Sequence, residues 1–173
     1  MLKNMKGFLS LILVILTAFS FSTTAFAAGV DYEEKQEVFD VQVSPTVSFV
    51  LYQDEAVAQQ TRAKEYTSDS YTGYFYLTAT GKKISNHTFK AYFSYSGDLV
   101  TCYNTDTTVT MDKDYTGNLR PEVENEGRST VTPTLAYGYV TFVLYNTDDS
   151  VNTEVTIHIY CNQEGTTWVE RQG

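Results

Sequence analysis

The chain has little of what most catalytic and metal sites require. It contains two histidines and two cysteines in 173 residues. The zinc spacings His-x-His and His-Glu-x-x-His are absent, and so is the Gly-x-Ser-x-Gly turn that presents a nucleophilic serine. His87 and His158 stand alone, and we expect structural roles for both. The sequence therefore predicts no catalytic residue and a protein that is not an enzyme.

Positive charge is also scarce. The chain carries 12 lysines and arginines against 21 acidic residues. Nucleic acid and anionic lipid both require a basic surface, so the charge balance argues against either as a partner. It permits cations or cationic partners, although a solvated acidic surface explains the same composition.

The chain has one long apolar run, and it lies close to the N-terminus. Residues 8–21 are almost wholly apolar and follow a basic segment that contains Lys3 and Lys6. The run is about 14 residues long, short of the ~20 that span a bilayer, which argues against a retained anchor. Ala25 and Ala27 are the small residues that signal peptidase selects. We expect a cleavable signal peptide of the Gram-positive type over residues 1–27, and a secreted, extracellular protein with no membrane contact after cleavage.

A strong helical period of 3.6 is missing from the rest of the chain, whereas a period of two recurs. Residues 154–161 alternate apolar and polar side chains, and similar segments of 5–10 residues are separated by turn residues such as Ser96-Gly97-Asp98. The pattern predicts an all-β fold, an antiparallel sandwich or barrel of about seven to nine strands. We expect a flexible acidic arm over residues 28–37 and one β-domain over residues 38–173.

Two segments do not fit the strand pattern. Residues 54–64 begin with acidic and end with basic side chains, as a helix does, so a short surface helix or an irregular crossover is expected there. Residues 112–127 are polar and are expected to connect two strands.

The two cysteines, Cys102 and Cys161, both follow the export signal. A lone pair of cysteines in a small secreted domain usually forms a disulfide. The sequence therefore predicts one bridge between them, closing a loop of about 60 residues.

The sharpest local motif is Asp112-Lys113-Asp114-Tyr115-Thr116-Gly117. Asp112, Asp114 and Thr116 match the first three ligand positions of a calcium loop, and Gly117 matches its turn. The glutamate required at position 12 is replaced by Val123. We therefore expect an acidic turn and no cofactor, with calcium as the alternative.

Aromatic residues are what the chain has in excess: 14 tyrosines, 10 phenylalanines and one tryptophan. Tyrosine and tryptophan bury a large area at low entropic cost, and they suit glycan and protein partners, although tyrosine also has a high strand propensity. A single sheet face shared with Lys90 and His158 is expected to carry Tyr92, Tyr137, Tyr139 and Tyr160. The candidate ligand-binding aromatics are these four tyrosines and Trp168.

These observations favour a small non-enzymatic module that recognises or adheres to a surface glycan, a cell wall or a protein partner. A secreted toxin or bacteriocin-like effector fits the same size and export signal. A small extracellular hydrolase is the third alternative, and it requires two carboxylates facing each other across a cleft.

Overall fold

The computed structural model describes residues 35–54, 57–61 and 64–172. The expected signal peptide and most of the expected acidic arm lie outside these residues. The described part of the chain contains strands and turns and no helix, and no helix there is long and apolar enough to cross a membrane. The predicted all-β class is confirmed.

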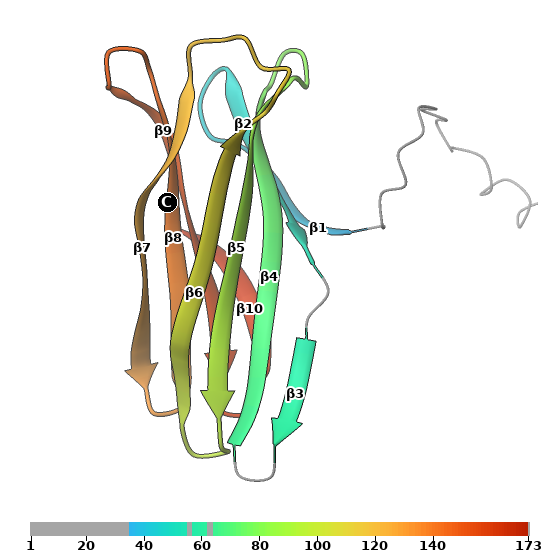
Figure 1. The fold of residues 1–173 in the computed structure, drawn as a ribbon, viewed down its shortest axis with the longest axis vertical. Coiled ribbons are helices and arrows are strands. Elements are labelled where there is room, and N and C mark those ends of the chain that lie inside the picture. The colour runs from blue at the N-terminus through green and yellow to red at the C-terminus, as the bar shows by residue number, and fades with distance from the viewer. Residues whose placement is uncertain (1–34, 55–56, 62–63, 173) are drawn as a thin grey trace, which may run out of the picture. The chain divides into compact units, whose positions relative to one another are not determined.

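Ten strands form two antiparallel sheets, one more strand than the upper limit expected from the sequence (Figure 1). Sheet A has the order β1-β2-β4-β5-β6, and β3 pairs with the free part of β4. Its strands are β1 (Gln36–Gln42), β2 (Val47–Gln53), β3 (Val57–Thr61), β4 (Lys64–Leu77), β5 (Lys83–Tyr95) and β6 (Val100–Met111). Sheet B has the order β10-β9-β8-β7. Its strands are β7 (Arg120–Thr132), β8 (Leu135–Tyr145), β9 (Val151–Asn162) and β10 (Thr167–Gln172).

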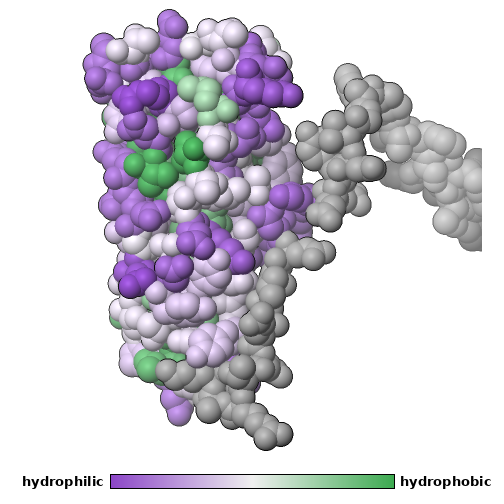
Figure 2. Space-filling view, viewed as in Figure 1, coloured by the Kyte–Doolittle hydropathy of each residue, from purple (hydrophilic) through white to green (hydrophobic). Residues whose placement is uncertain are grey.

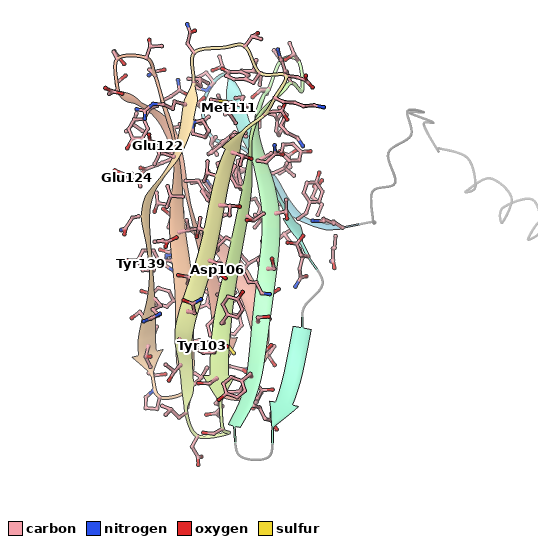
Figure 3. All side chains as sticks on the ribbon, in the orientation of Figure 1. Tyr103, Asp106, Met111, Glu122, Glu124 and Tyr139 are labelled. Atoms are coloured by element: carbon pink, nitrogen blue, oxygen red, sulfur yellow. The ribbon has the colours of Figure 1, made fainter. Side chains whose placement is uncertain are left out.

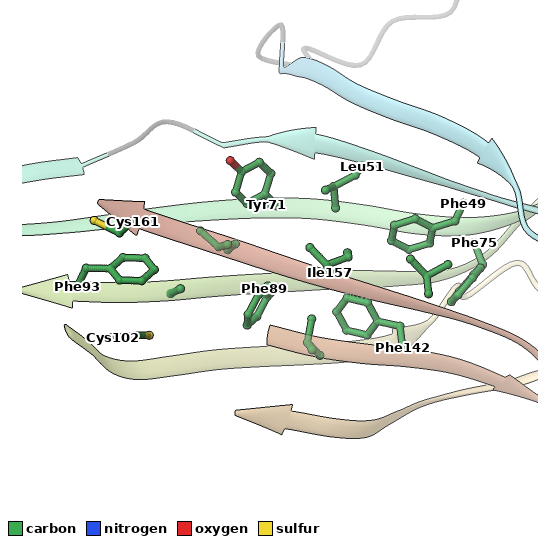
Figure 4. Close-up of a cluster of buried hydrophobic side chains, with 14 of the residues drawn as sticks. Phe49, Leu51, Tyr71, Phe75, Phe89, Phe93, Cys102, Phe142, Ile157 and Cys161 are labelled. Atoms are coloured by element: carbon green, nitrogen blue, oxygen red, sulfur yellow. The ribbon is translucent and has the colours of Figure 1, made fainter. Parts of the chain in front are cut away.

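The core lies between the inner faces of the two sheets (Figure 4). Alternation in β9 illustrates the rule: Val155, Ile157 and Ile159 are buried, whereas His158 and Tyr160 lie on the opposite face. The aromatic centre of the core consists of Phe49, Phe75, Phe89, Phe93 and Phe142, all of them 0–1 % exposed.

Glycines with a left-handed backbone close turns between strands, among them the expected turn at Ser96-Gly97-Asp98. Gly97 adopts a φ of 80° between β5 and β6, and Gly165 adopts the same φ between β9 and β10. At Gly165 an added Cβ would meet the Tyr95 ring at 2.2 Å, whereas at Gly97 it would meet no atom within 4 Å. The β9–β10 turn therefore packs its bare backbone against an aromatic ring at the end of β5.

Two segment assignments were wrong. Residues 57–61 form β3, which pairs with residues 64–68 of β4, so a paired strand replaces the short helix or irregular crossover expected over residues 54–64. The polar segment over residues 112–127 contains the first half of β7. As an edge strand bonded only to β8, β7 has one hydrogen-bonding edge unpaired within its sheet, and its side chains are mostly exposed.

The predicted disulfide is also wrong: Cys102 and Cys161 are both free thiols. Cys102 lies on β6 of sheet A and Cys161 on β9 of sheet B, and Figure 4 draws the Phe93 ring between them. Each Sγ approaches a carbonyl of its own strand, at 3.6 Å to Asn104 and 3.4 Å to Asn162. The two cysteines pack as small apolar residues of the core. The number of cysteines and an expected oxidising compartment were therefore not sufficient to predict a disulfide between them.

Candidate functional site

The outer face of sheet B carries a row of aromatic side chains that crosses three neighbouring strands. Tyr137 and Tyr139 come from β8, His158 and Tyr160 from β9, and Trp168 from β10. Cross-strand register aligns them, because Tyr137 lies opposite Tyr160, Tyr139 opposite His158, and Trp168 opposite Tyr160 on its other side. We call these five residues the aromatic strip.

The rings of the strip pack against one another. Tyr160 and Trp168 lie 5.3 Å apart between ring centroids at an interplanar angle of 12°. Tyr137 and His158 lie 4.7 Å apart at 15°, and Tyr137 also lies 5.4 Å from Tyr160. Aromatic pairs at these distances contribute about 0.5–1.5 kcal/mol each beyond the area they bury. The strip is therefore preorganised, and a ligand would have few side-chain rotations left to freeze.

Glycine 127 of β7 allows the strip to extend across the next strand. It lies opposite Tyr139, and a Cβ added to it would fall 2.8–2.9 Å from atoms of the Tyr139 ring. The Tyr139 ring thus lies over bare backbone, and a side chain at position 127 would displace it. Figure 3 shows Tyr139 beside β7.

Polar groups surround the strip without adding positive charge. Trp168 Nε1 donates a hydrogen bond to Glu170 Oε1 at 3.2 Å, and Gln172 Nε2 donates to the Tyr160 hydroxyl at 3.3 Å. Burial lowers the pKa of His158 below its ordinary value, with the Glu170 carboxylate opposing the shift. His158 is therefore neutral at pH 7, and none of the direct cross-strand partners of the strip is a lysine or arginine.

One of the four tyrosines of the predicted face, Tyr92, lies elsewhere. Tyr92 is on the outer face of sheet A, together with Lys90, whose Nζ lies 4.9 Å from the Tyr92 ring centroid. The structure thus groups four of the five predicted aromatics with His158 and separates Tyr92 and Lys90 from them. It also reveals two polar neighbours of the strip that sequence reasoning missed, Glu170 and Gln172. The alternation of β10, which puts them on the face of Trp168, could have indicated both.

The candidate calcium motif forms a turn after β6. Asp112 Oδ1 accepts a hydrogen bond from the Asp114 backbone amide at 3.0 Å, and the Tyr115 amide donates to the Asp112 carbonyl at 3.1 Å. Residues 35–54, 57–61 and 64–172 contain no group of three or more His, Cys, Asp or Glu side chains placed to hold a metal ion. Asp112 therefore organises the local backbone, and calcium stays an untested alternative for Asp112, Asp114 and Thr116.

The remaining polar groups of chemical interest are enclosed in the core. His87 is 1 % exposed and contacts the rings of Phe49, Phe75 and Phe142. Its Nε2 lies 2.7 Å from Ser85 Oγ, and burial lowers its pKa to about 3. A substrate could reach this Ser–His pair only if the sandwich opened.

The one fully buried carboxylate of the described residues is Asp69. Its oxygens accept hydrogen bonds from the Tyr71 hydroxyl at 2.8 Å, the Ser70 amide at 3.0 Å and Gln53 Nε2 at 3.3 Å. An ionised carboxylate can accept about four hydrogen bonds, so the three donors already occupy most of its acceptor positions. This arrangement is that of a structural buried polar group rather than an acid or base facing a cleft.

Comparisons with protein-family models, with curated proteins and with solved structures found no match to this chain.

Proposed function

We propose that the protein is a secreted, non-enzymatic recognition module that binds an uncharged surface or cell-wall glycan through the aromatic strip. The observation that carries the proposal is the in-register packing of Tyr137, His158, Tyr160 and Trp168 across three strands. Such a row is a feature of the outside of the sandwich, where core packing does not require it. Trp168 keeps 36 % of its surface exposed.

The chemistry of the strip favours a saccharide. Ring edges and indole carbons provide apolar contact for the C–H groups of a sugar ring, and tyrosine hydroxyls both donate and accept hydrogen bonds. Gln172 and Glu170 add amide and carboxylate groups beside the rings. These groups match the alternating C–H and hydroxyl surface of a carbohydrate.

The charge of the strip selects among glycans. Polymers rich in phosphate, sulfate or carboxylate are recognised through arginine and lysine. The strip and its cross-strand partners contain neither, and Glu170 would repel an anionic polymer. An uncharged glycan therefore fits this surface better than an anionic one.

The test is co-sedimentation of the protein with bacterial cell walls, insoluble chitin and cellulose. The protein is used in the form that the expressing cell produces after processing. Tyr160→Ala/Trp168→Ala is expected to lower the bound fraction at least tenfold, and Gly127→Val is expected to weaken binding by displacing the Tyr139 ring. Tyr145→Ala is the matched control, because Tyr145 lies on β8 about 20 Å along the strand from Tyr139. Equal binding by the folded double variant and the wild type would refute the proposal.

The diffusible effector is the second candidate. If the wild-type protein pellets with none of the polymers but arrests the growth of bacterial cultures, a diffusible effector is the better proposal. The hydrolase receives no support from the described carboxylates, of which Asp69 alone is buried.

A further inference from the structure

The outer face of sheet A carries a second aromatic cluster, on the opposite side of the sandwich from the strip. Tyr103 lies 6.0 Å from Tyr66 and 6.1 Å from Tyr92 between ring centroids. The three tyrosines come from β6, β4 and β5, so this cluster also spans three neighbouring strands. Together with Lys90 and Asp106 they form what we call the sheet A cluster.

A β-bulge exposes the central ring of this cluster. Tyr92 pairs with Asn104 and Phe93 pairs with Cys102, so Tyr103 is the extra residue of β6. An inserted residue breaks the alternation of the strand and redirects its side chain. Tyr103 is consequently 45 % exposed, and Figure 3 shows it with Asp106 over β5 and β6. Bulges persist at binding sites because they aim a side chain that regular pairing would turn elsewhere.

Polar groups around the three rings are arranged as donors and acceptors. The Tyr92 hydroxyl donates to Asp106 Oδ2 at 2.8 Å, and Asn104 Nδ2 lies 3.5 Å from Asp106 Oδ1. Lys90 lies directly opposite Asp106 in the β5–β6 register. Lys90 and Asp106 balance each other in charge, and both keep hydrogen-bonding capacity toward solvent. Arg128 of β7 donates to the backbone carbonyl of Tyr103 at the edge of the cluster.

The space-filling view agrees with a polar, aromatic surface. Where described residues are drawn, the face in Figure 2 carries mostly polar side chains, with apolar ones in small separate groups. A second copy of the chain or a helix would bury an apolar area, which this face does not offer. Pairs of hydroxyls on a sugar can instead bond the carboxylate, amide and ammonium groups, while its C–H face contacts the tyrosine rings.

We propose that the sheet A cluster is a second binding site for an uncharged glycan, which makes the domain bivalent. The inference rests on the proposed function of the strip and extends it. Because the two sites lie on opposite faces, one molecule can hold two polymer chains at once. Bridging of glycan chains follows.

The test counts sites and measures bridging separately. Isothermal titration of the purified protein with cellohexaose and chitohexaose is expected to give two sites per chain. Each of two double variants should retain one binding site: Tyr92→Ala/Tyr103→Ala and Tyr160→Ala/Trp168→Ala. Light scattering with soluble glycol chitin and hydroxyethyl cellulose should rise for the wild type and stay flat for either double variant. Tyr76→Ala, on the same face of sheet A, is the matched control and should behave as the wild type.

The outcomes distinguish the two proposals. If Tyr92→Ala/Tyr103→Ala still binds oligosaccharide at two sites per chain and still bridges polymers, the second site is refuted and the proposal for the strip is unaffected. Two sites in Tyr160→Ala/Trp168→Ala overturn the strip. If Tyr92→Ala/Tyr103→Ala changes the oligomeric state without glycan and leaves the site number at that of the wild type, the cluster is a protein interface and the inference fails. Absence of binding by the wild type to either oligosaccharide and either polymer overturns both proposals.

Discussion

Protonation of His87 should destabilise the fold as the pH falls through the mildly acidic range. The imidazole is enclosed by Phe49, Phe75 and Phe142, and its Nδ1 has no hydrogen-bond partner. An imidazolium there would have no compensating charge or second acceptor, and burial accordingly lowers the pKa of His87 from 6.5 to about 3. Between these two values the unfolded chain binds a proton that the folded chain does not. The contribution of neutral His87 to the free energy of unfolding is therefore complete above pH 6.5 and decreases progressively as the pH falls toward 3.

The size of the effect follows from the two pKa values. At pH 5 the protonated form of an unfolded histidine outnumbers the neutral form about 30-fold. Protonation therefore stabilises the unfolded chain but not the folded one. The free energy of unfolding is consequently about 2 kcal/mol lower at pH 5 than at pH 7.5. The full shift corresponds to about 5 kcal/mol near pH 3. The value at pH 5 depends only on the folded pKa lying well below 5.

Urea unfolding followed by far-UV circular dichroism at pH 7.5 and pH 5 measures this loss. Ser85→Ala/His87→Phe removes the imidazole and its hydrogen-bond partner together, so no buried hydroxyl is left unpaired. Its loss of unfolding free energy between the two pH values should be smaller than that of the wild type by about 2 kcal/mol. His158→Gln is the control for the other histidine, which lies at the surface and should contribute less. Equal losses in the wild type and the double variant would refute the burial argument.

Two further predictions concern the core and the turns. Gly165→Ala should destabilise the protein by about 2–4 kcal/mol, because it adds a contact with Tyr95 to the cost of a left-handed backbone, whereas Gly97→Ala, at the same φ of 80° with open space, should cost only about 1–2 kcal/mol. Thermal unfolding of the two variants compares them, and equal costs would show that the Tyr95 contact is unimportant. Burial raises the pKa of Cys102 to about 11 and that of Cys161 to about 12, so both thiols should react with Ellman's reagent many times more slowly in the native protein than in urea. Failure to titrate two thiols after unfolding without reductant would show that they form a bond.

The sequence predicted the fold where side chains alternate and failed where other forces decide. The Val155, Ile157 and Ile159 alternation gave the inner face of β9 correctly. The first half of β7 was assigned to a connection, because most side chains of this edge strand are exposed and an exposed strand needs no apolar period. Residues 54–64 were expected to form a short helix or an irregular crossover from the charges at their ends, whereas residues 57–61 pair with the free edge of β4.

The candidate site shows the same limit. Alternation tells which side chains of one strand share a face, but it does not tell which strands share a sheet. Tyr92 and Tyr137 were therefore assigned to one surface, although they belong to different sheets. Tyr103 could not be recognised from the sequence, because the bulge that exposes it depends on the pairing of β5 and β6.

The stacking of Trp168 on Tyr160 has an optical consequence. Trp168 is the only tryptophan of the chain, so all indole fluorescence originates within the aromatic strip. A ligand that displaces water from the indole would shift its emission toward the blue, and energy absorbed by the many tyrosines would be collected at this one ring. The protein thus carries an intrinsic probe at one of the two surfaces proposed to bind, so selective excitation of the indole reports occupancy of the aromatic strip without any label.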